Sequence, residues 1–131
     1  MWSPPWMSGS SFGATPADIA SGEVIVYRGA SDGQPEKIRA APYYFATSET
    51  FSRVYGPTAA FRLKLKNPLI VDRGEWYQFA NSRFIPMEAV VQKLADRSEQ
   101  DGTVYDSVIS DFGNIQVVFV LNAKKTAKLV K

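Results

Sequence analysis

Neither cysteine nor histidine occurs among the 131 residues of this chain. The lack of cysteine excludes disulfide bonds, thiol nucleophiles and zinc–thiolate sites. The lack of histidine excludes a Ser-His-Asp triad, Cys-His machinery and a His-ligated metal centre. Carboxylates, amides, hydroxyls and arginines are therefore the groups left for any chemistry that the chain performs.

Long apolar runs and a strong excess of charge are also missing. No apolar stretch approaches the roughly 20 residues of a membrane span, and MWSPPWMSGSSFG lacks the basic start and apolar core of a signal peptide. We therefore expect no membrane association and a cytoplasmic setting, with a host cytoplasm or delivery by a virion as alternatives. A formal charge of +2 and the lack of a basic stripe give no strong nucleic-acid signal.

The composition that is present fits one globular domain over residues 1–131. The chain is 45% hydrophobic and 21% charged, which excludes a disordered or fibrous class. Residues 1–14 hold several Trp, Pro and Gly residues and are predicted to form a loose arm. Residues 123–131 contain the basic run KKTAKLVK, which we interpret as a solvated terminus rather than a nucleic-acid arm.

Short strands alternate with two or three helices in the hydrophobic pattern. Helices are predicted over residues 15–22, 48–56 and 86–100, and strands over residues 23–29, 43–48, 58–65, 69–72, 103–110 and 115–122. The polar stretches 31–42 and 72–83 are predicted loops. The second contains Trp76 and Tyr77, which could contact a target or pack beneath the loop. The order of elements predicts an α+β fold built on antiparallel strands.

Four features stand out as candidates for chemistry. They are Arg28-Gly29 at a strand end, Tyr44-Phe45 on the next strand, Ser52 and Tyr55 one helical turn apart, and Gln116 at the start of the last strong strand. Each has a structural interpretation as well: a surface ion pair for the arginine, core packing for the tyrosines, and an outward strand face for the glutamine.

The order and spacing of these features carry a resemblance to a known superfamily. The segment YYFATSETFSRVYG resembles the nicotinamide-binding segment of the ADP-ribosyltransferases, particularly their poly(ADP-ribose) polymerase and diphtheria-toxin branches. VYRGA is similar to the His-Gly or Arg-Gly pair upstream of it. YRG, LKLKNPLIVD, YDSVIS and QVVFV also occur in the order typical of small phage and toxin members, so the resemblance covers roughly residues 24–122.

This resemblance implies a split antiparallel β-sandwich with short flanking helices and NAD as a substrate. It implies that Tyr44 and Tyr55 sandwich the nicotinamide ring, that Ser52 bonds the carboxamide, and that Phe45 belongs to the binding strand. On physical grounds Arg28 offers a rigid fork of donors for ribose or phosphate. Gly29 allows the main chain to approach the nicotinamide closely.

Gln116 is where the chain departs from the superfamily, which normally has a glutamate there. An amide can orient the ribose 2′-hydroxyl but brings no negative charge, so Asp106 or Asp111 is a candidate for the missing carboxylate. Asp106 has a competing interpretation as a turn-stabilising side chain. The sequence therefore predicts a mono-ADP-ribosyltransferase effector that modifies a host macromolecule, with an inactive binding or inhibitor module, or a phage accessory protein, as alternatives.

Overall fold

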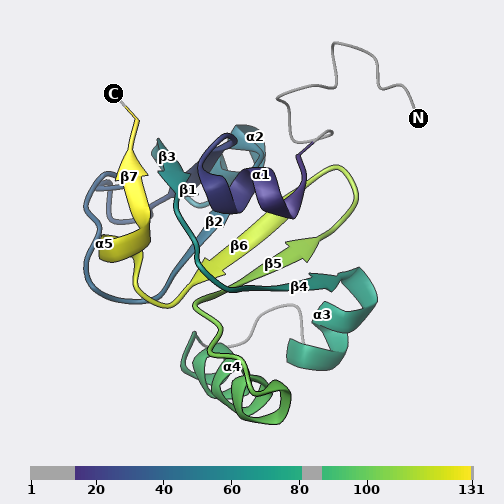
Figure 1. Cartoon of the computed structure of the whole chain (residues 1–131). Coiled ribbons are helices and arrows are strands. Elements are labelled where there is room, and N and C mark those ends of the chain that lie inside the picture. The colour runs from purple at the N-terminus through teal and green to yellow at the C-terminus, as the bar shows by residue number, and fades with distance from the viewer. Residues whose placement is uncertain (1–13, 81–86, 131) are drawn as a thin grey trace.

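The computed structural model describes residues 14–80 and 87–130, with side chains of residues 77–80 excepted. In this part of the chain seven strands form one sheet in the order β4-β5-β6-β2-β1-β3-β7, and five helices surround it (Figure 1). The strands are β1 (Ile25–Gly29), β2 (Tyr43–Ala46), β3 (Thr58–Leu63), β4 (Pro68–Asp72), β5 (Ser107–Asp111), β6 (Gln116–Val120) and β7 (Ala127–Leu129). The helices are α1 (Pro16–Ser21), α2 (Glu49–Arg53), α3 (Arg73–Ala80), α4 (Met87–Asp101) and α5 (Ala123–Thr126).

Local hydrogen bonds define the ends of two short helices that the sequence predicts. The Thr15 hydroxyl accepts from the Asp18 N–H at 3.1 Å, and Gly22, at φ 87°, ends α1. The Ser48 hydroxyl accepts from the Phe51 N–H at 3.1 Å and begins α2. The helix α2 ends at Arg53, earlier than the predicted residue 56. None of the helices in the described ranges is long and apolar enough to cross a membrane.

Each face of the sheet carries its own hydrophobic core, because side chains alternate along the strands. Val118 and Val120 of β6 lie in the first core and Phe119 lies in the second. The first core includes Ile19 of α1, and the second includes Leu94 of α4. Burying both faces in this way positions α1 on one side of the sheet and α3 and α4 on the other.

Strand pairing confirms a mixture of helices and strands but corrects the expectation of purely antiparallel strands. Five of the six pairings are antiparallel, whereas β4 and β5 are parallel. The connection between them passes through α3 and α4, and a parallel pair needs such a crossover. The hydrogen-bonded strands also form one continuous series of seven rather than two separate sheets.

The polar stretch predicted as a loop contains helix α3. The Asp72 carboxylate accepts from the Glu75 N–H at 2.8 Å, and Glu75 Oε1 accepts from the Asp72 N–H at 3.3 Å, which is a reciprocal cap. Trp76 is only 6% exposed and packs in the second core, so the packing interpretation of this residue is correct. The side chain of Tyr77 lies outside the described residues, as do residues 1–13 of the predicted N-terminal arm.

The basic run near the C-terminus is folded, which corrects its interpretation as a solvated tail. Asn122 caps α5, and β7 then pairs with β3 at the edge of the sheet (Figure 1). Ala127 and Leu129 pack against the first core, whereas Lys128 between them is exposed. Hydrophobic residues at every second position therefore hold this segment in the sheet.

The docking of β7 can be tested with two substitutions on its opposite faces. Leu129→Ala should lower the free energy of unfolding by about 1–2 kcal/mol, because it removes apolar area packed on the first core. Lys128→Ala should change it by less than about 0.5 kcal/mol. Urea denaturation measures both values. If Leu129→Ala were as neutral as Lys128→Ala, residues 127–129 would not be docked.

Candidate functional site

The main chain of Gly29 lies where β1 and β2 stop pairing. β1 pairs with β3 through Gly29 opposite Thr58, but within the described residues the one β1–β2 pair is Tyr27 opposite Ala46. The Ala30 N–H donates to the Pro57 carbonyl at 2.9 Å on the β3 side. Because antiparallel pairs alternate, the Gly29 N–H and C=O are directed to the other side, toward β2 and beyond the last β1–β2 pair. Gly29 thus presents one donor and one acceptor at a point where the pairing has ended.

The helix α2 packs directly on Gly29. A Cβ atom at this position would lie 1.9 Å from the Ser52 carbonyl oxygen and 3.3 Å from the Tyr55 Cβ. No side chain fits in that space, so glycine is required for the approach of the helix. The structure therefore brings together three of the predicted residues: Gly29, Ser52 and Tyr55.

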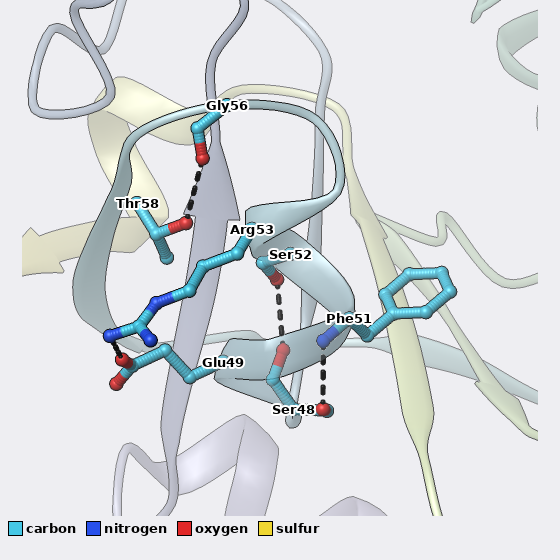
Figure 2. Close-up of polar contacts among 7 residues, drawn as sticks. All are labelled: Ser48, Glu49, Phe51, Ser52, Arg53, Gly56 and Thr58. Carbon is cyan, nitrogen blue, oxygen red and sulfur yellow. Dashed lines mark hydrogen bonds and ion pairs between the residues drawn. The ribbon is translucent and has the colours of Figure 1, made fainter.

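The Ser52 hydroxyl connects α2 to β1. Ser52 is 3% exposed, and its Oγ lies 3.0 Å from the Ser48 carbonyl oxygen (Figure 2). The same Oγ lies 3.2 Å from the Tyr27 carbonyl oxygen. A hydroxyl has a single hydrogen, which it donates to one of these carbonyls at a time, and it keeps lone pairs that can accept. Ser52 therefore holds α2 against β1 from inside the contact between the two elements.

The two predicted stacking tyrosines have different surroundings. Tyr44 packs edge to face on Phe119 with ring centroids 5.0 Å apart, and burial raises the pKa of its phenol to about 12. Tyr55 is 49% exposed, and its ring contacts Phe51 at 5.9 Å. No ring contact joins Tyr44 to Tyr55 in the described part of the chain, so a ring sandwiched between them stays a prediction. Phe51, the partner of Tyr55, is a neighbour that the sequence analysis missed.

Phe45 and Arg28 point to the opposite face of the sheet from Tyr44 and Gly29. Phe45 is 1% exposed and packs on Phe61 in the first core, which corrects its assignment to cofactor binding. The Arg28 Nη1 donates to the Pro35 carbonyl at 2.9 Å and to the Gln34 carbonyl at 3.2 Å.

The Arg28 guanidinium also lies 4.6 Å from the centre of the Tyr43 ring, a cation–π contact. In this arrangement Arg28 holds the loop of residues 31–42 against the start of β2. The structure therefore does not place Arg28 beside the group formed by Gly29, Ser52 and Tyr55.

Gln116 lies in a buried hydrogen-bonded group at the other end of β2. It is 4% exposed, and its N–H donates to the Thr47 hydroxyl at 2.9 Å. Its Nε2 donates to Asp111 Oδ1 at 3.1 Å, and its Oε1 lies 3.5 Å from Thr47 Oγ1. Asp111 therefore places a carboxylate beside the Gln116 amide. It is one of the two aspartates that the sequence offered as the missing carboxylate.

Asp106 is separated from this group and has a structural role. Its carboxylate accepts from the Lys66 N–H at 2.7 Å and from the Asn67 N–H at 3.1 Å. It precedes β5, whereas Asp111 ends that strand opposite Gln116, so roughly 17 Å of strand separate the two aspartates. This placement corrects Asp106 as a catalytic candidate and agrees with the turn-stabilising interpretation.

A shallow, open depression of about 420 Å³ adjoins the Gln116 group. Its lining comes from the ends of β4 and β5 and from the start of α3: Asp72, Arg73, Gly74, Asp111, Phe112 and Gly113. The Arg73 guanidinium donates to the Phe112 carbonyl at 3.0 Å. Asp72 and Arg73 are not among the residues predicted for a site, because the sequence pattern does not indicate that β4 and β5 are parallel and end side by side.

Comparisons with known proteins identify no relative of this chain. It matches no protein-family model, and no curated protein or solved structure is significantly similar to it. A candidate function must therefore come from the arrangement of the residues described above.

The tight packing at Gly29 predicts a large cost for a single methyl group. Gly29→Ala should lower the free energy of unfolding by about 2 kcal/mol or more, because the helix must shift away from β1. Gly74→Ala is the matched control, since its Cβ would meet nothing closer than 3.4 Å and would lie in a helix. The control should be neutral or stabilising by up to about 1 kcal/mol. Equal effects in thermal or urea denaturation would contradict the packing.

The raised pKa of Tyr44 predicts an alkaline spectroscopic step. Ultraviolet titration at the tyrosinate band should show one phenol that ionises near pH 12, and Tyr44→Phe should remove that step. Because the pKa in the folded protein exceeds the ordinary value near 10, the associated stability is complete below pH 10. It is lost as the pH rises from about 10 to 12. A titration unchanged by Tyr44→Phe would show that Tyr44 is not buried as described.

Proposed function

We propose that this chain binds NAD as a substrate and acts as a mono-ADP-ribosyltransferase effector on a host macromolecule, with an ADP-ribosyltransferase-like fold. The observation that carries the proposal is the close packing of Gly29 with Ser52 and Tyr55 at the end of β1–β2 pairing. These are the residues that the resemblance assigns to nicotinamide binding, and they come from segments more than 20 residues apart in the sequence.

The chemistry of nicotinamide supports this assignment. Its carboxamide carries one acceptor oxygen and an NH₂ donor, and the Gly29 N–H and C=O form the complementary donor–acceptor pair. The Ser52 hydroxyl offers a further polar contact. The half-exposed ring of Tyr55 can stack on the flat pyridinium ring, whose positive charge favours an aromatic face.

Transfer requires cleavage of the bond between nicotinamide and the ribose C1′. The bonding electrons leave with nicotinamide, an oxocarbenium-like centre develops at C1′, and a nucleophile of the acceptor attacks there and loses its proton. Gln116 would orient the ribose 2′-hydroxyl through its amide. Asp111, 3.1 Å from that amide, would supply the negative charge that favours the cationic centre.

The neutral side chain at position 116 limits what the site is expected to do. An amide held by a neighbouring carboxylate stabilises positive charge less directly than a glutamate in the same place. We therefore assign a single transfer rather than polymer building. Arg28 is assigned the support of the loop 31–42, since its guanidinium contacts that loop.

Incubation with labelled NAD tests the proposed activity. We expect release of nicotinamide and transfer of the label to an acceptor from a host lysate. Tyr55→Ala should weaken NAD binding about tenfold in calorimetry, as expected for the loss of one stacking ring. Val54→Ala, at the neighbouring position and 81% exposed, is the matched control and should bind normally. Absence of both NAD binding and nicotinamide release would contradict the proposal.

A second candidate function is a binding module that retains the site without turnover. The buried, uncharged Gln116, engaged by both Thr47 and Asp111, favours it. This form of the protein would bind NAD or a partner protein but release no nicotinamide.

The double variant Gln116→Glu/Asp111→Asn distinguishes the two functions because it exchanges the amide and the carboxylate while keeping a hydrogen bond between them. An active wild-type protein identifies a transferase. If the double variant releases nicotinamide and the wild-type protein does not, the wild-type protein is the binding module. If neither releases nicotinamide and neither binds NAD, both functions are contradicted.

A further inference from the structure

Basic side chains gather on one face of the β3–β7 edge. Arg62, Lys64 and Lys66 are exposed and alternate with Phe61, Leu63 and Leu65, which are buried in the first core. Lys128 of β7 lies opposite Arg62 in the register and shares its face. We call these four exposed cations the basic face: Arg62, Lys64, Lys66 and Lys128.

In the part of the chain that the structure describes, no cation of the basic face forms an ion pair, and the nearby Asp106 carboxylate is held by the main-chain N–H groups of Lys66 and Asn67. Within the described residues the ion pairs join Glu49 to Arg53 and Asp101 to Arg97, both on helices elsewhere. The Arg62 guanidinium donates to the Gly22 carbonyl at 2.7 Å, which orients it without cancelling its charge. Lys124 and Lys125 of α5, the helix that leads into β7, are exposed as well and add to the positive charge of this edge.

The folded C-terminal segment is what creates this surface. A solvated tail would hold Lys128 at no fixed distance from Arg62, whereas the β3–β7 pairing places them directly opposite each other. Arg62 lies on β3, and Lys64 and Lys66 follow in the segment after its last residue, Leu63. The Lys64 N–H donates to the Thr126 carbonyl at 2.8 Å, which holds this segment beside the start of β7. The four cations are therefore gathered at the β3–β7 edge.

The chemistry of the face favours nucleic acid over a protein partner. Protein interfaces depend on buried aromatic or aliphatic anchors. The exposed large hydrophobic residues of the described chain come from other segments than the four cations: they are Phe51, Val54, Tyr55, Ile70, Met87 and Val104. Phosphate contacts need only Lys and Arg. We propose that the basic face binds the phosphate backbone of a nucleic-acid strand, independently of the proposed NAD site.

Fluorescence anisotropy with a labelled 20-nucleotide single-stranded DNA tests this proposal on the full chain. Four phosphate contacts give a slope of about −2.8 in log K against log salt, which is a loss of roughly 50-fold in affinity between 50 and 200 mM salt. Lys64→Gln/Lys128→Gln should halve that slope, to about −1.4. Both lysines are exposed, so the variant should remain folded, which circular dichroism checks.

Lys93→Gln/Arg97→Gln removes the same charge on α4, which packs in the second core with β4 and β5 at the other side of the sheet, and is the matched control. It should retain the wild-type slope. Equal weakening by the two double variants would show a nonspecific effect of net charge and would overturn the proposal. So would an absence of binding at 50 mM salt, or equal competition by poly-glutamate at the same charge concentration, which would indicate an acidic protein partner. None of these outcomes depends on NAD turnover.

Discussion

The missing side chain at Gly29 determines how closely α2 can approach β1, and the candidate site depends on that approach. With the Ser52 carbonyl oxygen 1.9 Å from where a Cβ would lie, the helix can hold its position only against glycine. The hydrogen bond from the Ser52 hydroxyl to the Tyr27 carbonyl then joins the helix to the strand two residues before Gly29. Since Ser48 caps the helix and Tyr55 follows it, this one contact sets the position of the whole segment from β2 to β3.

A second constraint operates where β5 and β6 meet. The pairing of Asp111 with Gln116 places a carboxylate and an amide together, and Thr47 joins them to the end of β2. Gly29 lies beside the edge of β2 that faces β1, whereas Gln116 contacts Thr47, the residue after β2 ends. In the proposed mechanism both groups must reach one nicotinamide riboside unit, because the ribose that Gln116 would orient is bonded directly to the nicotinamide. The separation of Gly29 from Gln116 is therefore the most demanding requirement of the proposed site.

Local signals in the sequence predicted the features that depend on neighbouring residues. Thr15 and Ser48, the first residues of two predicted helices, cap those helices, and burial alternates from Phe61 to Leu65 as in a half-buried strand. Helix caps and alternation are set within a few residues, which is why they can be predicted locally. The packing of Gly29 on Ser52 and Tyr55 joins distant segments, and the role that the resemblance gives these residues stays a prediction.

Features that depend on distant partners were not predictable in the same way. The sequence of residues 127–129 is typical of a charged tail, and its pairing depends on the distant strand β3. Leu129 has a hydrophobic surface to pack on only when that pairing forms. The parallel alignment of β4 and β5 depends on the packing of α3 and α4, which connect them. The sequence around Trp76 is polar and does not predict a helix that packs on the sheet. The direction of Arg28 depends on the carbonyls of a loop that has no periodicity.

The backbone amide of Gly29 gives the most direct test of the account. In a nicotinamide titration followed by ¹H–¹⁵N correlation spectra, the Gly29 resonance should shift saturably, because its N–H would donate to the carboxamide oxygen. The Gly33 resonance, from the exposed turn after β1, should not move. A saturable shift at Gly29 that Tyr55→Ala weakens is the result we predict. An unmoved Gly29 resonance at saturating nicotinamide would contradict a nicotinamide site at this strand end.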